Sequence, residues 1–258
     1  WMRERLSELR PGEQDLVLLP EFANAPGITE PAALVEFAST HGADFARSLA
    51  AAAKGLRCLV AAGLACPRGA EWVNRTLLLG PDGESVAAYD KTHLTAAERE
   101  LGLSAGNVVV TAEHGGVRFG FATCMDIYLP DLLEAVAARG VDVILHPSYQ
   151  RSETPERIRL LCRGRALDTG AYVARAGYAM GTPERGGTSL VAAPDGSLVG
   201  DAGAEAGVLR CDFDPGAKFV KPASHGQAPV EHRALVESLR RPGLYRPAVD
   251  RTSDLLRT

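Results

Sequence analysis

The 258 residues carry a formal net charge of −4 and 46% hydrophobic side chains, which allows a sizeable core and offers no basic face for nucleic acid. No apolar run approaches the ~20 residues of a membrane-spanning helix, and the start of the chain lacks the apolar region of a signal peptide. The five cysteines include no CxxC pair and the six histidines form no HExxH or HxH pattern, so we expect a cytoplasmic protein with free thiols and no metal.

Apolar runs alternate with segments of helical period along the chain. Strands are predicted over residues 16–19, 57–65, 73–79, 85–89, 117–123, 142–146 and 171–178. Helices are predicted over residues 2–10, 31–54, 130–139 and 154–169. The Pro-Asp-Gly turns at 81–83 and 194–196 predict antiparallel hairpins, so the pattern indicates an α/β protein with mixed sheets.

No linker divides the chain, and residues 1–258 are interpreted as a single domain. The last part, residues 221–258, is rich in proline and arginine. This composition is typical either of a poorly ordered tail or of an arm that lies against a neighbouring subunit.

Three side chains with catalytic chemistry each follow the end of a predicted strand. Glu21 follows the apolar run that ends at Pro20, Lys91 follows 85–89, and Cys124 follows 117–123. Each has an ordinary explanation when taken alone: a loop glutamate, a surface lysine and a buried structural cysteine. Because open α/β sheets place their sites at the carboxyl ends of strands, we expect the three to meet at one rim.

Cys124 lies on a predicted tight connection between a strand and a helix, the kind of turn that presents a nucleophile. A nearby helix N-terminus and a cation would lower the pKa of its thiol. A carboxylate such as Glu21 can carry a proton, and the ammonium of Lys91 can stabilise an oxyanion.

The sequences around these residues resemble the carbon–nitrogen hydrolase family, also called the nitrilase superfamily. The resemblance rests on Leu19-Pro-Glu-Phe22, Tyr89-Asp-Lys-Thr-His-Leu94 and Cys124-Met-Asp-Ile-Tyr-Leu-Pro-Asp131, and it extends to residues 74–84, 163–168, 187–196 and 240–245. It implies a four-layer α-β-β-α sandwich, no cofactor and a Glu21-Lys91-Cys124 triad. The family normally opens with a strand, whereas this chain enters a helix almost at once, so the first strand is expected to be missing from the chain start.

The resemblance also implies a second glutamate beside the lysine. Glu98 matches that position best and Glu100 is the second choice, while the plain alternative for both is a charged helix face. The segment from His146 to Arg151 follows a strand and is either a polar loop or part of the pocket. Expected substrate-binding residues are Met125, Tyr128, Ser148 and Tyr149, and Arg151 could pair with a substrate carboxylate.

Cys124-Met125-Asp126 is similar to the amidase and carbamoyl-hydrolase branch, because true nitrilases carry Cys-Trp-Glu there. The predicted function is hydrolysis of a small amide or N-carbamoyl compound through a cysteine thioester, releasing ammonia or an amine. The resemblance implies a homodimer, and no nucleic-acid or membrane partner is expected. A nitrilase, a catalytically degenerate interaction module and a papain-like Cys–His enzyme stay open as alternatives.

Overall fold

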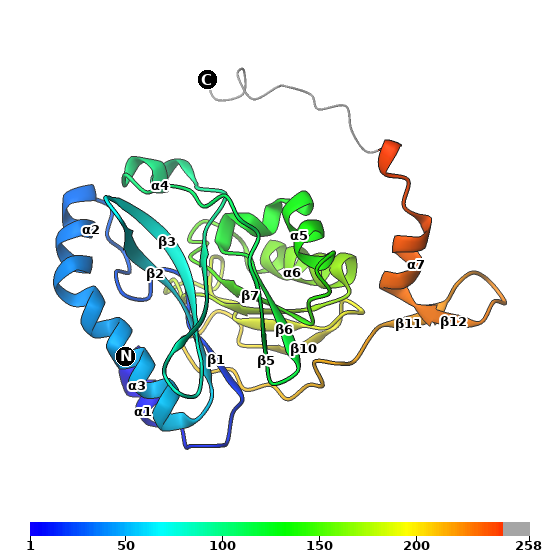
Figure 1. The fold of residues 1–258 in the computed structure, drawn as a ribbon, viewed down its shortest axis with the longest axis horizontal. Coiled ribbons are helices and arrows are strands. Elements are labelled where there is room, and N and C mark those ends of the chain that lie inside the picture. Colours follow the sequence, from blue (N-terminus) through cyan, green and yellow to red (C-terminus); the bar gives the residue numbers. More distant parts are fainter. Residues whose placement is uncertain (245–258) are drawn as a thin grey trace. The chain divides into compact units, whose positions relative to one another are not determined.

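The structure is a computed structural model that describes residues 1–244. Its contacts divide the chain into two compact units, residues 1–217 and 218–258. The helices and strands of both units are labelled in Figure 1. The functional residues predicted above all belong to the first unit.

The helices of the first unit are α1 (Met2–Ser7), α2 (Pro31–Phe37), α3 (Ala43–Leu56), α4 (Ala96–Glu100), α5 (Pro130–Ala137) and α6 (Pro155–Thr169). Its strands are β1 (Leu16–Leu18), β2 (Leu59–Arg68), β3 (Glu71–Leu79), β4 (Ser85–Asp90), β5 (Thr111–His114), β6 (Val117–Phe121), β7 (Val143–Pro147), β8 (Tyr172–Ala176), β9 (Leu190–Ala192) and β10 (Leu198–Asp201). A π-helical turn, Ala38–Gly42, joins α2 to α3, and a 3₁₀ turn, Cys124–Tyr128, precedes α5.

The strands form two mixed sheets, as predicted. In the first, the order is β1-β2-β3-β4, with β1 parallel to β2 and the other pairs antiparallel. In the second, the order is β10-β9-β8-β7-β6-β5, with β6, β7 and β8 parallel and the other pairs antiparallel. Both Pro-Asp-Gly turns close antiparallel hairpins, β3–β4 and β9–β10.

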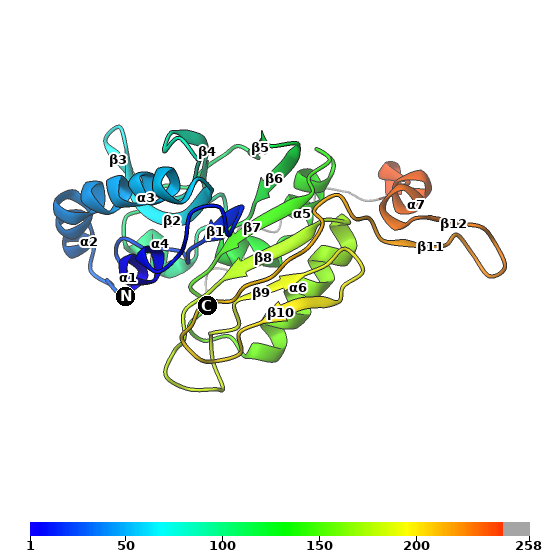
Figure 2. The same cartoon turned by 90° about the horizontal axis from the view of Figure 1, so that it is seen from below.

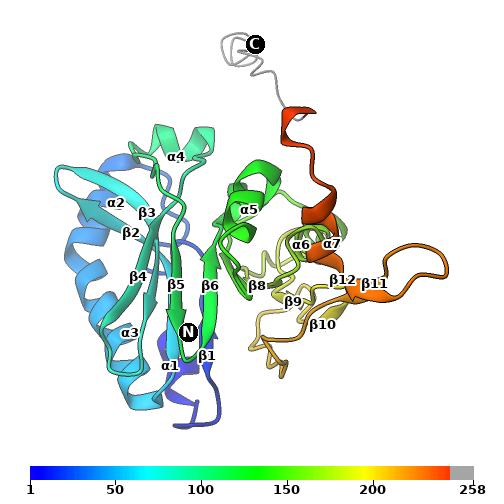
Figure 3. The same cartoon turned by 45° about the vertical axis from the view of Figure 1, so that its right-hand side comes forward.

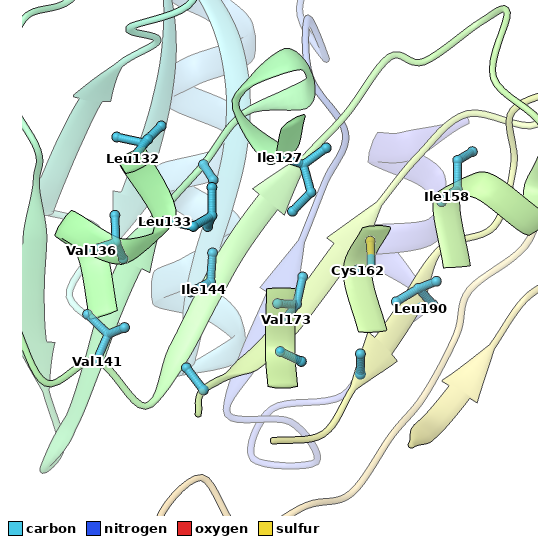
Figure 4. Packing of buried hydrophobic residues seen from close by; sticks show 14 residues of the cluster. Ile127, Leu132, Leu133, Val136, Val141, Ile144, Ile158, Cys162, Val173 and Leu190 are labelled. Carbon is cyan, nitrogen blue, oxygen red and sulfur yellow. The ribbon is translucent and has the colours of Figure 1, made fainter. Parts of the chain in front are cut away.

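Three apolar layers hold helices and sheets together. Leu49 of α3 packs in one cluster with Val60 of β2 on the outer face of the first sheet. Between the sheets, Tyr89 stacks on Phe121 with ring centroids 6.1 Å apart. On the far face of the second sheet, α5 and α6 bury the cluster drawn in Figure 4, which includes Ile144 of β7. The predicted four-layer α-β-β-α sandwich is therefore confirmed (Figure 3).

Helix α6 covers the second sheet (Figure 2). Both of its ends carry the residues that usually begin and end a helix. Thr154 accepts a hydrogen bond from the backbone N–H of Arg157 at the N-terminus, and Gly170 adopts a left-handed conformation, φ 66°, at the C-terminus. The predicted helix 31–54 is wrong in one respect, because the π-helical turn interrupts it before α3. The predicted helix 2–10 ends at Ser7.

The second unit, described on its own, contains β11 (Val220–Pro222) paired antiparallel with β12 (Pro229–Glu231), then α7 (His232–Leu239) and a 3₁₀ turn, Pro242–Leu244. The predicted arm, residues 221–258, therefore begins with a hairpin and a helix, and its part from 245 onward lies outside the described residues. Within residues 1–244 no helix combines the length and the apolar character that crossing a bilayer requires.

Candidate active site

Glu21 lies just beyond β1, where the backbone hydrogen bonds to β2 continue after the end of the strand. Leu19 donates a backbone hydrogen bond to Ala61 at 2.8 Å, and Ala23 donates to Gly63 at 2.7 Å. A Cβ at Gly63 would lie 2.6 Å from the Cα of Glu21, so the close approach of the two backbones requires glycine there. Glu21 is only 1% exposed.

Lys91 follows β4, the strand at the opposite edge of the same sheet, which runs in the same direction as β1. Its backbone N–H donates to Asn74 of β3 at 2.8 Å, and the residue is 1% exposed. Its Nζ donates to Glu21 Oε1 at 2.9 Å and to Glu98 Oε2 at 2.7 Å. The structure thus places an ammonium between two buried carboxylates.

Asn74 and Glu98 complete this cluster. The amide nitrogen of Asn74 donates to Glu21 Oε1 and to Glu98 Oε1, each at 2.7 Å. Glu98 lies in the first turn of α4, where Thr95 forms a reciprocal capping box with it, while Glu100 of the same helix is exposed. Of the two glutamates considered, only Glu98 contacts Lys91 in this structure.

Electrostatics keep Lys91 charged in this cluster. Burial alone lowers the pKa of a lysine, but Glu21, Cys124 and Glu98 raise the pKa of Lys91 by more, so its net shift is upward. The ammonium therefore persists at neutral pH, with the charge that an oxyanion would need.

Cys124 is the first residue of the 3₁₀ turn after β6 and has a positive φ of 49°. Such a conformation is unusual for a non-glycine residue and is typical of sharp turns that present a functional side chain. Asp126, fully buried, accepts hydrogen bonds from the Thr123 N–H at 2.8 Å and the Tyr89 hydroxyl at 2.7 Å. Ile127 of the same turn points into the core in Figure 4, so the turn is anchored on both sides.

The thiol of Cys124 responds to its surroundings in a way that the sequence did not predict. Burial raises its pKa to about 12, and Glu21 adds to that rise, whereas Lys91 and a hydrogen bond from the Tyr149 backbone N–H lower it. The expectation of a lowered pKa is wrong, because desolvation of the 8% exposed residue outweighs the cation. The thiol is thus protonated at neutral pH.

The expected pocket residues take different places. Tyr128 donates its hydroxyl to the Glu153 carboxylate, and its pKa is raised by burial, by Glu153 and by Cys124. Ser148 is fully buried, and its hydroxyl donates to Gln150 Oε1 at 3.0 Å, which is a hydrogen bond within the same loop. The exposed Arg151 lies over the ring of Tyr149 at 5.0 Å. Met125 is half-buried beside Cys124.

Other residues near the site were missed by the motif analysis. Tyr178 packs its ring 4.7 Å from that of Tyr149, and its buried hydroxyl has no hydrogen-bond partner among the described residues. Arg175 is a buried guanidinium in β8. Its signal in the sequence is a single charge inside the otherwise apolar run of residues 172–176. Among residues 1–244, no three His, Cys, Asp or Glu side chains gather as metal ligands would.

Comparison with known proteins gives a match to the family described as carbon–nitrogen hydrolase, over residues 4–217. The hydrolase Rv0480c of Mycobacterium tuberculosis is 34% identical over 177 residues, which cover 60% of this chain and 62% of that protein. This chain thus matches less than two thirds of that relative. The ω-amidase NIT2 of Bos taurus is 29% identical over 213 residues, covering 77% of this chain and 76% of the relative.

Solved structures give the same fold. The amidase from Nesterenkonia sp. AN1, in a mutant form with acrylamide added to its active-site cysteine, superposes with a TM-score of 0.71 at 24% identity. The match covers 82% of this chain and 84% of the other. At this level of identity the likeness establishes the fold.

Proposed function

Because this chain belongs to the carbon–nitrogen hydrolase family, the nitrilase superfamily, we propose that it hydrolyses a non-peptide carbon–nitrogen bond of a small amide or N-carbamoyl compound. We assign Cys124 as the nucleophile, Glu21 as the proton carrier and Lys91 as the oxyanion stabiliser. One observation carries this proposal: the buried cluster of Glu21, Lys91 and Glu98 acts electrostatically on a thiol held at a positive φ.

In the first half-reaction, Glu21 takes the thiol proton of Cys124 while the sulfur attacks the carbonyl carbon. The carbonyl π electrons move to the oxygen, and the resulting oxyanion is stabilised by the ammonium of Lys91 and the backbone N–H of Met125. The adduct then collapses to a thioester. The carbon–nitrogen bond breaks, and the nitrogen leaves as ammonia or an amine after taking the proton from Glu21.

In the second half-reaction, Glu21 takes a proton from water as the water oxygen attacks the thioester carbonyl. The carbon–sulfur bond breaks, the acid departs, and the sulfur recovers the proton from Glu21. The same carboxylate therefore acts twice. Glu98 and Asn74 hold Lys91 and Glu21 in place through both steps. Neither Glu98 nor Asn74 gains or loses a proton in this mechanism.

Three observations bear on the substrate class. ω-Amidase NIT2 of Bos taurus and the 2-oxoglutaramate amidase of Bacillus subtilis are named for amide substrates, and Cys124-Met125-Asp126 is similar to the amidase and carbamoyl-hydrolase branch. Arg151 stands exposed over the Tyr149 ring, where its guanidinium could bind a substrate carboxylate. An ω-amide acid or an N-carbamoyl acid is therefore our preferred substrate.

Ammonia release from a panel of primary amides, N-carbamoyl amino acids and nitriles tests the proposal. We expect turnover of amides or carbamoyl compounds, none with Cys124→Ala, and nearly none with Cys124→Ser because a hydroxyl is far harder to ionise than a thiol. Cys211→Ala is the matched control, since that half-buried thiol should be dispensable. Turnover that survives Cys124→Ala would refute the assignment, and turnover of nitriles alone would favour a nitrilase.

We also propose that the chain forms a homodimer, with residues 221–258 as an arm at the subunit interface. Sedimentation equilibrium of the full chain measures the mass directly. Deletion of residues 221–258 should weaken association if this segment is an arm at the subunit interface.

A further inference from the structure

Arg175 is a buried cation with no anionic partner in the described chain. It is 3% exposed, and no carboxylate of residues 1–244 lies within 4.0 Å of its guanidinium. Asp201, the acidic side chain of β10 that influences it, is ion-paired to Arg159 at 2.5 Å. His146, its neighbour on β7, has a pKa lowered to about 3 by burial and by Arg175, so it is neutral.

Burying such a charge costs free energy, because its hydration is lost and no counter-ion replaces it. Burial lowers the pKa of Arg175, and the groups that raise it include Cys162, Cys124 and Glu21. Two of these three are the proposed nucleophile and the proposed base. Arg175 pairs with His146 in the register of β8 on β7, one residue before the end of β7 at Pro147.

The hydrogen bonds of Arg175 all go to the two loops at this end of the sheet. Its Nη1 donates to the carbonyl oxygens of Gly187 at 2.6 Å and Thr188 at 2.8 Å. Residues 186–188 all have positive φ values, between 56° and 63°, and Thr188 adopts this conformation with a β-branched side chain. The guanidinium thus stabilises a strained turn before β9.

The other arm of the guanidinium holds the loop after β7. Its Nη2 donates to Gln150 Oε1 at 3.2 Å, and the same oxygen accepts the Ser148 hydroxyl at 3.0 Å. The Ser148 backbone N–H donates to Ala176 at 2.9 Å. Tyr149 lies between these two tethered residues, and its backbone N–H is the one that hydrogen-bonds to the Cys124 thiol.

We propose that Arg175 is a positioning residue for the nucleophile. Its guanidinium clamps the 148–150 loop so that the Tyr149 N–H meets the Cys124 sulfur. This inference rests on the proposed role of Cys124 but concerns the reactivity of the thiol, which can be measured without any substrate.

The test is alkylation of Cys124 by iodoacetamide in the full chain, followed by mass spectrometry across pH 6–10. We expect Arg175→Met to slow alkylation of Cys124 by roughly 10- to 100-fold, the factor expected for a lost hydrogen bond to a charged sulfur. Gln150→Leu breaks the link to the loop but keeps the guanidinium, so it should slow alkylation by a smaller factor. The double variant should be slowed by less than the product of the two factors.

Arg163→Met is the matched control, because Arg163 donates from its Nε to the carbonyl of Gly196, in a turn at the opposite end of β9. It should leave alkylation of Cys124 unchanged. If Arg175→Met does not fold, Arg175→Lys keeps the charge without the two-armed geometry and should give an intermediate rate. Wild-type alkylation rates in folded Arg175→Met, or in Arg175→Lys where Arg175→Met does not fold, would overturn the inference. That result would leave the proposed function standing, whereas turnover that survives Cys124→Ala would remove the function itself.

Discussion

Glu98→Gln perturbs the buried cluster by one charge while keeping the shape of the side chain. Glu98 Oε2 accepts from three donors: Lys91 Nζ at 2.7 Å, the Thr95 N–H at 2.9 Å and the Thr95 hydroxyl at 3.0 Å. Oε1 accepts from Asn74 at 2.7 Å. Whichever way a glutamine amide turns, its NH₂ faces a buried donor, unless Asn74 turns over and gives up its bond to Glu21.

The magnitude follows from the burial of the pair. The side chains of Lys91 and Glu98 are 1% and 6% exposed, and removal of one partner of a buried ion pair destabilises a protein by about 3–5 kcal/mol. For a chain of this size each kcal/mol lowers the melting temperature by about 2–4 °C, so we expect a decrease of roughly 6–20 °C. Amide hydrolysis should fall as well, because Lys91 loses one of the two carboxylates that hold it.

Calorimetric melting of Glu98→Gln at neutral pH, beside the wild type, measures this effect. Glu100→Gln provides the control, because it makes the same charge change two residues further along α4 at an exposed position, where about 0.5 kcal/mol or less is expected. If the two variants melt within ~2 °C of each other, Glu98 does not compensate Lys91, and the account of the cluster given above is wrong.

Two further changes test the geometry and the electrostatics of the site. Gly63→Ala places a Cβ 2.6 Å from the Cα of Glu21 and should destabilise the chain by about 3 kcal/mol in denaturant titrations, with loss of hydrolysis. The control is Gly164→Ala in α6, where a Cβ meets nothing within 4 Å, and it should be neutral or stabilise the chain by up to about 1 kcal/mol. Equal effects of the two substitutions would contradict the argument that the backbones of Gly63 and Glu21 approach closely. The second change is in pH. Burial raises the pKa of Cys124 from 9.0 to about 12, so its contribution to the free energy of unfolding is complete below pH 9 and is lost as the pH rises towards 12. Between pH 9 and 12 the free energy of unfolding should therefore decrease by roughly 4 kcal/mol less in Cys124→Ala than in the wild type. Equal decreases in the two proteins would show that the folded thiol is not desolvated.

Much of the framework was predictable from the sequence because it depends on local patterns. The buried strands β7 and β8 are short apolar runs, and α6 carries both of its terminal signals, Thr154 and Gly170. Helix α4, with five residues, and β5, with four, are too short for periodicity to reveal. The π-helical turn at 38–42 was not predicted for another reason: a single extra residue within a helix does not change the amino-acid composition of the segment.

In the candidate site, too, some residues were predictable from local patterns and others were not. Glu21, Lys91 and Cys124 could be selected because each follows a strand end within a recognisable motif. The role of Asn74 could not, since a polar residue in β3 gives no hint that its amide will bridge two carboxylates from distant segments. The direction of the Cys124 pKa was mispredicted because burial is a property of the whole fold, while the nearby cation was visible in the motif.

Beside the burial of the thiol, the excess of two carboxylates over one lysine contributes to the raised pKa of Cys124. With Glu21 and Glu98 ionised and Lys91 charged, the cluster carries one net negative charge. Ionising the thiol by release of its proton to water would add a second negative charge in a buried space, which is what the raised pKa expresses. Transfer of the proton to Glu21 instead moves one charge from oxygen to sulfur and leaves the total unchanged. In the proposed mechanism, a thiol that hardly ionises towards solvent therefore becomes reactive when a substrate occupies the site and Glu21 takes the proton.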